Sequence, residues 1–168
     1  MKSSSNIPVV WAIIEKIIDW EKYILVQTRW KPWTEYHNTI ETPVWWIEER
    51  ENIYDCLARE ILEETNLTIT HINKQHKLSW DNSIGFNPFY CTQQLAIWLP
   101  WIMLCFVCQC TWDLKSQVSE TRNPQWIKVS QLQEFLDTNT IFDLQKPFFD
   151  FYCNYHEWIE YQKFDWLI

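Results

Sequence analysis

The segment from Glu51 to Asn66 carries the strongest structural pattern in the chain, because it specifies both ends and one face of a helix. Asn52 suits the N-cap position, and Asn66 suits a left-handed residue after the last turn. Apolar residues recur every four positions between them, at Ile53, Leu57 and Ile61. The pattern predicts a helix over 53–65 with one face packed on a core.

Acidic residues lie on one arc of this helix, next to its apolar face: Glu60, Glu63 and Glu64. Carboxylates at these spacings repel each other by about a few tenths of a kcal/mol per pair, and more strongly where they are half buried. A tight group of oxygen ligands suits a hard cation such as Mg²⁺ or Mn²⁺. A solvated acidic helix face is the alternative interpretation.

The spacing of these residues resembles the signature of the Nudix hydrolase family. The matching positions follow one another without a gap: Glu51, Arg59, Glu60, Ile61, Glu63, Glu64 and Leu67. The chain departs from the signature at its two glycines, which are Trp45 and Asn66 here. Asn tolerates a positive φ, so the second departure is mild, whereas a tryptophan in the first glycine position is a large change.

The resemblance implies an α+β fold, the Nudix-type α/β/α sandwich with a mixed central sheet, formed by one domain over residues 1–168. It also implies a metal-dependent pyrophosphohydrolase that cleaves a nucleoside diphosphate linked to another moiety. Glu60, Glu63 and Glu64 would then bind Mg²⁺ or Mn²⁺, and the backbone carbonyl of Trp45 would be a further ligand. The partner would be a small molecule.

Other residues near the signature receive supporting roles from the same resemblance. Arg59 would pair with Glu51 and hold the loop against the helix. Glu48 would join the metal shell or act as a base; the alternative is that it is a solvent-exposed loop carboxylate. Glu120 is a second candidate for the base. Arg29, at the end of an expected strand, would meet a phosphate or pair with an acid.

Trp45 and Trp46 favour a rival interpretation if they are the natural residues. Two indoles would crowd the approach of a metal and a phosphate to the backbone, which glycines would permit. The literal sequence therefore predicts a weakened or inactive site. The rival is a Nudix-fold binding or regulatory module that has lost catalysis.

The composition contains 13 Trp and a single glycine, Gly85, where a domain of this size would hold about 12 glycines. Several tryptophans stand where glycine is expected, such as Trp20 after Asp19 between two apolar runs. Some bacterial lineages read the codon UGA as glycine, and a different translation table reads it as tryptophan. We hypothesise that most of these tryptophans are glycines in the natural protein; a truly Trp-rich protein is the alternative.

The net charge of −8 and pI near 4.9 argue against a nucleic-acid binder and against a protein of anionic membranes. The N-terminal residues show no signal-peptide pattern, and the most apolar run, 95–110, is too short for a membrane span. The cysteines indicate core thiols in a reducing cytoplasm rather than a metal site. The oligomeric state stays open, a homodimer included.

The rest of the chain reads as strands before and after the central helix, with further helices near its end. The expected strands cover 7–18, 22–29, 39–42, 67–78, 89–95 and 101–110. Residues 81–88 are expected as a loop and 113–123 as a polar segment. A short helix should begin at Ser130, with Gln133 completing a capping box, and another at Pro147.

Overall fold

The computed structural model describes residues 7–30, 34, 36–75, 79–80, 83–95, 100–111, 121–138 and 140–164. The helices are α1 (Ile53–Thr65), α2 (Val129–Asp137) and α3 (Lys146–Tyr155). The strands are β1 (Ile7–Ile18), β2 (Glu21–Arg29), β3 (Ile40–Glu41), β4 (Val44–Trp46), β5 (Ile69–Asn73), β6 (Ser79–Trp80), β7 (Ser83–Ile84), β8 (Tyr90–Gln94), β9 (Trp101–Cys110), β10 (Thr121–Lys128) and β11 (Tyr161–Lys163).

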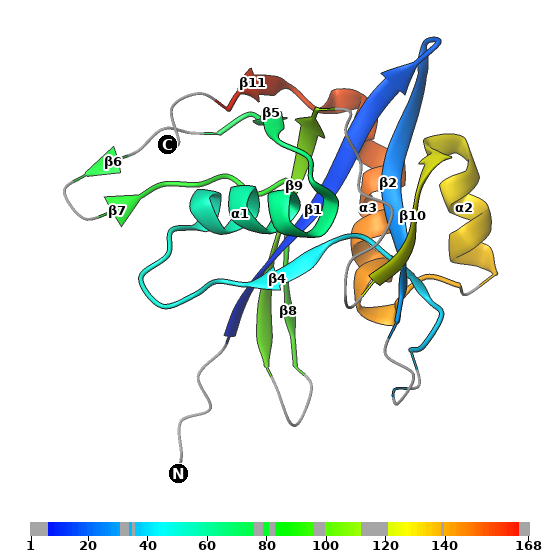
Figure 1. The fold of residues 1–168 in the computed structure, drawn as a ribbon, viewed down its shortest axis with the longest axis horizontal. Helices are drawn as coiled ribbons and strands as arrows, with labels where there is room; N and C mark the ends of the chain where they lie inside the picture. The colour runs from blue at the N-terminus through cyan, green and yellow to red at the C-terminus, as the bar shows by residue number, and fades with distance from the viewer. Residues whose placement is uncertain are drawn as a thin grey trace.

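A mixed sheet with the strand order β10-β2-β1-β9-β5-β11 forms the middle of the molecule (Figure 1). β1 runs antiparallel to β2 and parallel to β9, so it lies at the centre of the sheet. β3 adds to β2, β4 adds to β1, and β8 adds to β9. β6 and β7 form a separate small hairpin that extends away from the sheet (Figure 1).

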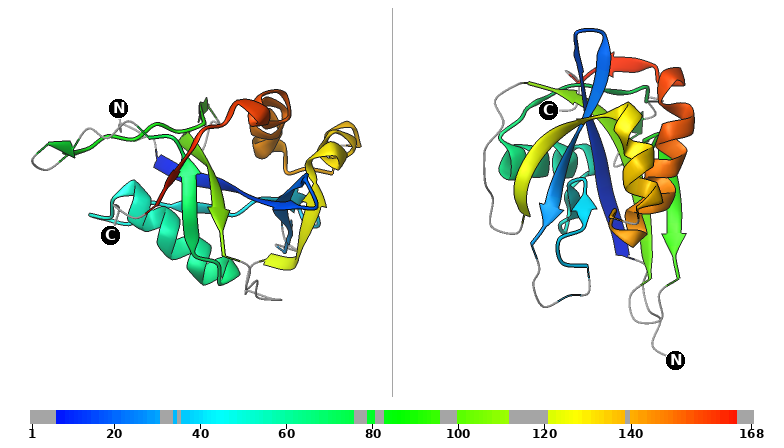
Figure 2. Two further views of the ribbon diagram at one scale, coloured as in Figure 1. Left: turned by 90° about the horizontal axis from the view of Figure 1, so that it is seen from above. Right: turned by 90° about the vertical axis from the view of Figure 1, so that its right-hand side faces the viewer.

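Helices cover both faces of this sheet: α1 packs on one face, and α2 and α3 pack on the other (Figure 2). Alternate residues of β1 face the two layers, as expected for a strand buried on both sides. Val10 and Ile14 pack with the α1 layer, while Val9 and Ile13 pack with the α2 and α3 layer. The fold is therefore the expected α/β/α sandwich with a mixed sheet.

Helix α1 begins and ends where the sequence predicts. The Asn52 side chain accepts hydrogen bonds from the backbone N–H groups of Tyr54 and Asp55, at 2.9 and 3.0 Å. Asn66 has φ 63°, and its N–H donates to the carbonyl of Leu62 at 2.8 Å. These caps satisfy backbone groups that a helix end leaves free, so local sequence decides both boundaries.

Other elements differ from the expectations. Among the described residues, the strand expected over 67–78 is Ile69–Asn73, and residues 76–78 lie outside the description. The loop expected over 81–88 contains the short strand Ser83–Ile84. Residues 113–120 of the expected polar segment also lie outside the description, and residues 121–123 belong to β10, which pairs with β2 across a register shift. The expected capping box at Gln133 is wrong: α2 begins at Val129, and the Gln131 side chain accepts the hydrogen bond from the Lys128 N–H.

In the described part of the chain, no helix combines the length and the apolar character needed to span a membrane.

Candidate metal and catalytic site

Arg59 on α1 holds the preceding loop against the helix. Its Nε and Nη2 donate to the two carboxylate oxygens of Glu51 at 2.7 and 2.8 Å, which is the bidentate geometry of a strong ion pair. Its Nη1 also contacts Glu60 at 2.5 Å and Glu63 at 3.5 Å. The hydrogen bonds from Arg59 lower the pKa of Glu51, and those to Glu51 raise the pKa of Arg59.

Glu64 is the most perturbed carboxylate on this helix. Burial raises its pKa from the ordinary 4.5 to about 7, and the charges of Glu60 and Glu41 add to the rise. The Gln27 amide opposes that rise, because its Nε2 donates to the Glu64 Oε2 at 3.2 Å. Glu64 is therefore a half-buried carboxylate that releases its proton only near neutral pH.

The other two glutamates of the predicted arc lie in different environments. Burial raises the pKa of Glu60, although its hydrogen bond with Arg59 opposes the shift. The Glu63 side chain is 62% exposed at the outer rim. The arc thus runs from the half-buried Glu64 to the exposed Glu63, with Glu60 bound to Arg59.

Trp45 occupies the space beside Glu64. It lies in β4 opposite Val10 of β1, and its side chain is only 4% exposed. Its indole N–H is near enough to stabilise the Glu64 charge, yet it is buried and makes no regular hydrogen bond among the described residues. An indole thus fills the position where the signature has a glycine.

Trp46 points away from this site. It is 45% exposed, and its ring packs edge-on against Trp101 with centroids 5.3 Å apart. Its carbonyl accepts a contact from the Cys56 thiol at 3.5 Å. Trp46 therefore crowds the outer surface of the loop, whereas Trp45 crowds the acidic site itself.

A second polar group borders the site on β2 and β3, and the sequence patterns missed it. Glu41 is 3% exposed and pairs with Gln27 across the two strands. Arg29 donates from Nη1 to Glu41 at 2.7 Å and lies over the Phe142 ring at 4.5 Å. Of the two roles expected for Arg29, the structure shows the pairing with an acid. The sequence feature that could have revealed this group is Gln27, a polar residue on the same strand face as the buried Leu25.

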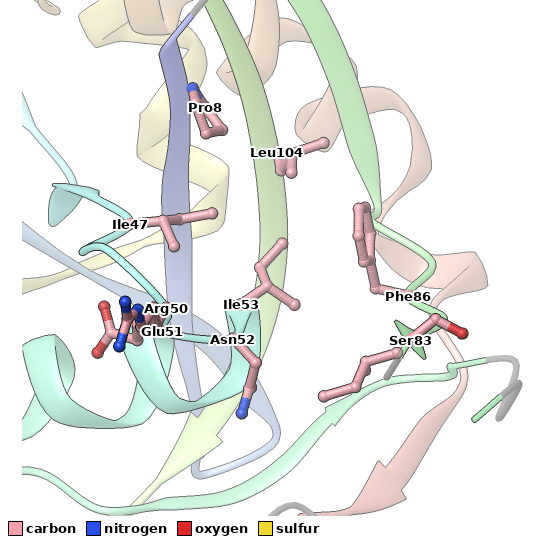
Figure 3. Close-up of a pocket in the computed structure, with 10 residues that line it drawn as sticks. Pro8, Ile47, Arg50, Glu51, Asn52, Ile53, Ser83, Phe86 and Leu104 are labelled. Carbon is pink, nitrogen blue, oxygen red and sulfur yellow. The ribbon is translucent and has the colours of Figure 1, made fainter. Parts of the chain in front are cut away.

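A cavity of about 680 Å³ lies at the N-terminal end of α1, and Glu51 is one of the residues that line it (Figure 3). Ile47, Ile53, Phe86 and Leu104 supply its apolar walls, and Arg50, Glu51 and Asn52 lie on the loop at its edge (Figure 3). Its volume is within the usual range for small-molecule sites. The aromatic rings of Phe89 and Tyr90 pack against Phe151 and Phe148 of α3 and are not part of this cavity.

The two remaining predicted residues are Glu48 and Glu120, the candidates for the base. Glu48 is exposed, and its backbone N–H donates to Glu51 at 3.1 Å. Glu120 lies outside the described residues. Among the residues with described positions, no three His, Cys, Asp or Glu side chains already converge as metal ligands. The donor set still fits a divalent cation, because Glu60 and Glu64 are oxygen ligands whose pKa values burial raises, and a cation would offset that cost.

Comparison with known proteins decides the family. The model of the NUDIX domain matches residues 9–148. The chain belongs to the Nudix family. A search of curated protein sequences finds no match.

Solved structures of the same fold cover almost the whole chain. The MutT protein from Methanosarcina mazei Go1 has a TM-score of 0.66 at 16% identity, over 94% of this chain and 99% of that one. The E. coli ORF135 protein has a TM-score of 0.66 at 18% identity, over 93% and 94%. A C. elegans Ap4A hydrolase binary complex has a TM-score of 0.60 at 14% identity, over 90% and 98%.

Family membership places the chain among hydrolases that act on pyrophosphate bonds, a class that generally uses divalent metals. The residues that resemble the Nudix signature lie on β4, the following loop and α1, so the acidic arc and the Arg59–Glu51 pair belong to one strand, loop and helix unit. The departure is equally local: Trp45 lies beside the half-buried Glu64, the carboxylate of α1 whose pKa is raised furthest.

Proposed function

We propose that this protein is a metal-dependent pyrophosphohydrolase that cleaves the diphosphate linkage of a nucleoside diphosphate joined to another moiety. The observation that carries the proposal is the environment of Glu64. Its carboxylate is half-buried near a second acidic group, with Gln27 as its hydrogen-bond donor, and desolvation raises its pKa to about 7. Two half-buried carboxylates with raised pKa values on one helix support a cation site.

Glu60, Glu63 and Glu64 would hold Mg²⁺ or Mn²⁺, with the backbone carbonyl of residue 45 as a further ligand. Such a cation, when bound, polarises phosphate oxygens and lowers the pKa of a bound water. Glu64 would give up its proton to bind the cation, and Arg59 would keep Glu51 and the loop in place. Glu48 and Glu120 are the candidates for the general base.

The proposed substrate class rests on the neighbours and on the cavity. One neighbour is the C. elegans Ap4A hydrolase, and the NUDIX domain of Shewanella oneidensis NrtR was crystallised with ADP ribose. Both names contain a nucleotide derivative, which supports a small-molecule substrate with a diphosphate linkage. The cavity beside Glu51 has room for a group attached to that linkage.

All six cysteines are free, and Cys56, Cys105 and Cys108 are buried. Burial raises the pKa of the Cys56 thiol to about 12, so this thiol is unreactive at neutral pH. Free thiols in a chain with this many cysteines support a reducing compartment, and we propose a cytoplasmic location.

We further propose that Trp20 and Trp45 stand for glycines in the natural protein. Asp19 and Trp20 both have positive φ, 50° and 67°, which is the turn geometry that favours Asp-Gly. Trp20 is 99% exposed, so no packing compensates for that backbone conformation. The codons at these positions, or the intact mass of the protein from its native host, test the proposal; TGG codons at both positions would contradict it.

The rival function is a binding module with a closed metal site, which the literal Trp45 favours. The two functions are separated by comparing the chain as written with a Trp45→Gly, Trp46→Gly variant, using Mg²⁺ or Mn²⁺ with nucleotide sugars, dinucleotides and nucleoside triphosphates. We expect turnover from the variant and at least tenfold less from the parent. Adding Glu63→Ala and Glu64→Ala to the variant should abolish turnover. If the variant neither hydrolyses any of these compounds nor takes up Mn²⁺, the hydrolase proposal is wrong.

A further inference from the structure

The Gln27 side chain is an unusual feature of β2. It is only 3% exposed, on a strand whose preceding three residues are fully buried apolar side chains. A buried amide with no partner would destabilise the fold, so its contacts show its role. The contact that the structure gives to its Nε2 is the hydrogen bond to Glu64, which lies 37 residues away in the sequence.

This hydrogen bond makes the two oxygens of Glu64 inequivalent. Gln27 donates to Oε2 and occupies one of its lone pairs, so Oε1 is the oxygen better placed to take another ligand. The backbone of Gln27 is itself fixed by its pairing with Glu41 on β3, and the neighbouring Arg29 holds the Glu41 carboxylate at 2.7 Å. The donor is therefore mounted on rigid sheet rather than on a loop.

We propose that Gln27 is a positioning residue for metal binding. It holds one oxygen of Glu64 so that the other faces the cation, a role that rests on the proposed hydrolase function. Residues that orient metal ligands in this way typically contribute about tenfold to 100-fold in metal affinity. The sequence signature does not include Gln27, because β2 lies outside the helix that carries the ligands.

The test uses a protein whose site is open, the Trp45→Gly, Trp46→Gly variant, and measures Mn²⁺ binding without substrate by calorimetry or by the loss of the free-ion EPR signal. Gln27→Met keeps the length of the side chain and removes the donor. We expect the Kd for Mn²⁺ to rise at least tenfold. Gln27→Asn keeps the amide but shortens the side chain, so the amide no longer reaches Glu64 and Mn²⁺ binding should also weaken. This variant provides the test if Gln27→Met does not fold.

Gln125→Met is the matched control, because Gln125 lies on the neighbouring strand β10 and its side chain is exposed. This control should bind Mn²⁺ as its parent does, and thermal unfolding of each protein separates a loss of fold from a loss of affinity. Folded Gln27→Met and Gln27→Asn proteins with Kd values within twofold of the control would overturn the inference. If the Trp45→Gly, Trp46→Gly protein with Gln27 intact takes up no Mn²⁺, the hydrolase proposal fails instead.

Discussion

The half-buried carboxylate of Glu64 should make the protein less stable as pH rises, and Glu64→Gln should remove that effect. Burial raises the pKa of Glu64 from 4.5 to about 7 in the folded protein. Between these pH values the folded state retains a proton that the unfolded chain has released. The free energy of unfolding therefore falls as pH rises through this window, and the full contribution is present only below pH 4.5.

The magnitude follows from the width of the window. A rise from 4.5 to about 7 corresponds to about 3 kcal/mol, at about 1.4 kcal/mol per pH unit. Glu64→Gln keeps the shape of the side chain and an oxygen that can accept from Gln27, but it carries no charge to bury. The unfolding free energy of the variant, relative to that of its parent, should therefore increase by about 3 kcal/mol as the pH rises from 4.5 to about 8.

Urea unfolding in chelator-containing buffer across this range measures the difference, because chelation removes any contribution from bound metal. The matched control is Glu63→Gln on the same helix, whose side chain is 62% exposed and is therefore not desolvated. The reasoning would be refuted if the two variants showed the same change in stability with pH.

The remaining predictions concern stability, and urea unfolding measures each of them. Trp20→Gly should raise the unfolding free energy by up to about 1 kcal/mol, because it relieves a left-handed φ of 67° without loss of packing; a decrease would contradict this. Arg59→Met should cost about 2–3 kcal/mol, because it leaves the Glu51 carboxylate, 13% exposed, without its partner; a loss below about 0.5 kcal/mol would mean that the pair is not structural. Glu15→Gln should cost about 2 kcal/mol, because Glu15 is buried and accepts from two tyrosine hydroxyls; an unchanged stability would show that its charge is unnecessary.

Helix α1 was predictable because its determinants are local. Asn52 and Asn66 cap it through bonds to residues within four positions, and the apolar spacing needs no knowledge of the rest of the fold. Strand β10 was not predictable in the same way. Asn123 has φ 52°, and the register shifts there, so the strand depends on pairing with β2, which lies about a hundred residues earlier.

The residues of the candidate site differ in the same way, because some could be predicted from local sequence and others could not. The acidic residues of α1 could be found from their spacing, because a helix converts fixed separations into one face. Gln27 and Glu41 could not, because strand pairing and a contact between distant segments bring them to Glu64. Glu15 is similar: the donors that justify its burial, Tyr152 and Tyr161, come from the opposite end of the chain.

Trp20 and Trp45 are unfavourable for unrelated physical reasons, and this independence gives the glycine hypothesis its weight. Trp20 is fully exposed, so the problem there is backbone conformation alone. Trp45 is buried in an ordinary strand, so the problem there is the indole, whose N–H has no hydrogen-bond partner of regular geometry among the described residues. The strained backbone at Trp20 and the poorly bonded indole N–H of Trp45 therefore have no common structural cause. Glycine would relieve both, because it accepts a positive φ and leaves the space beside Glu64 free for a ligand.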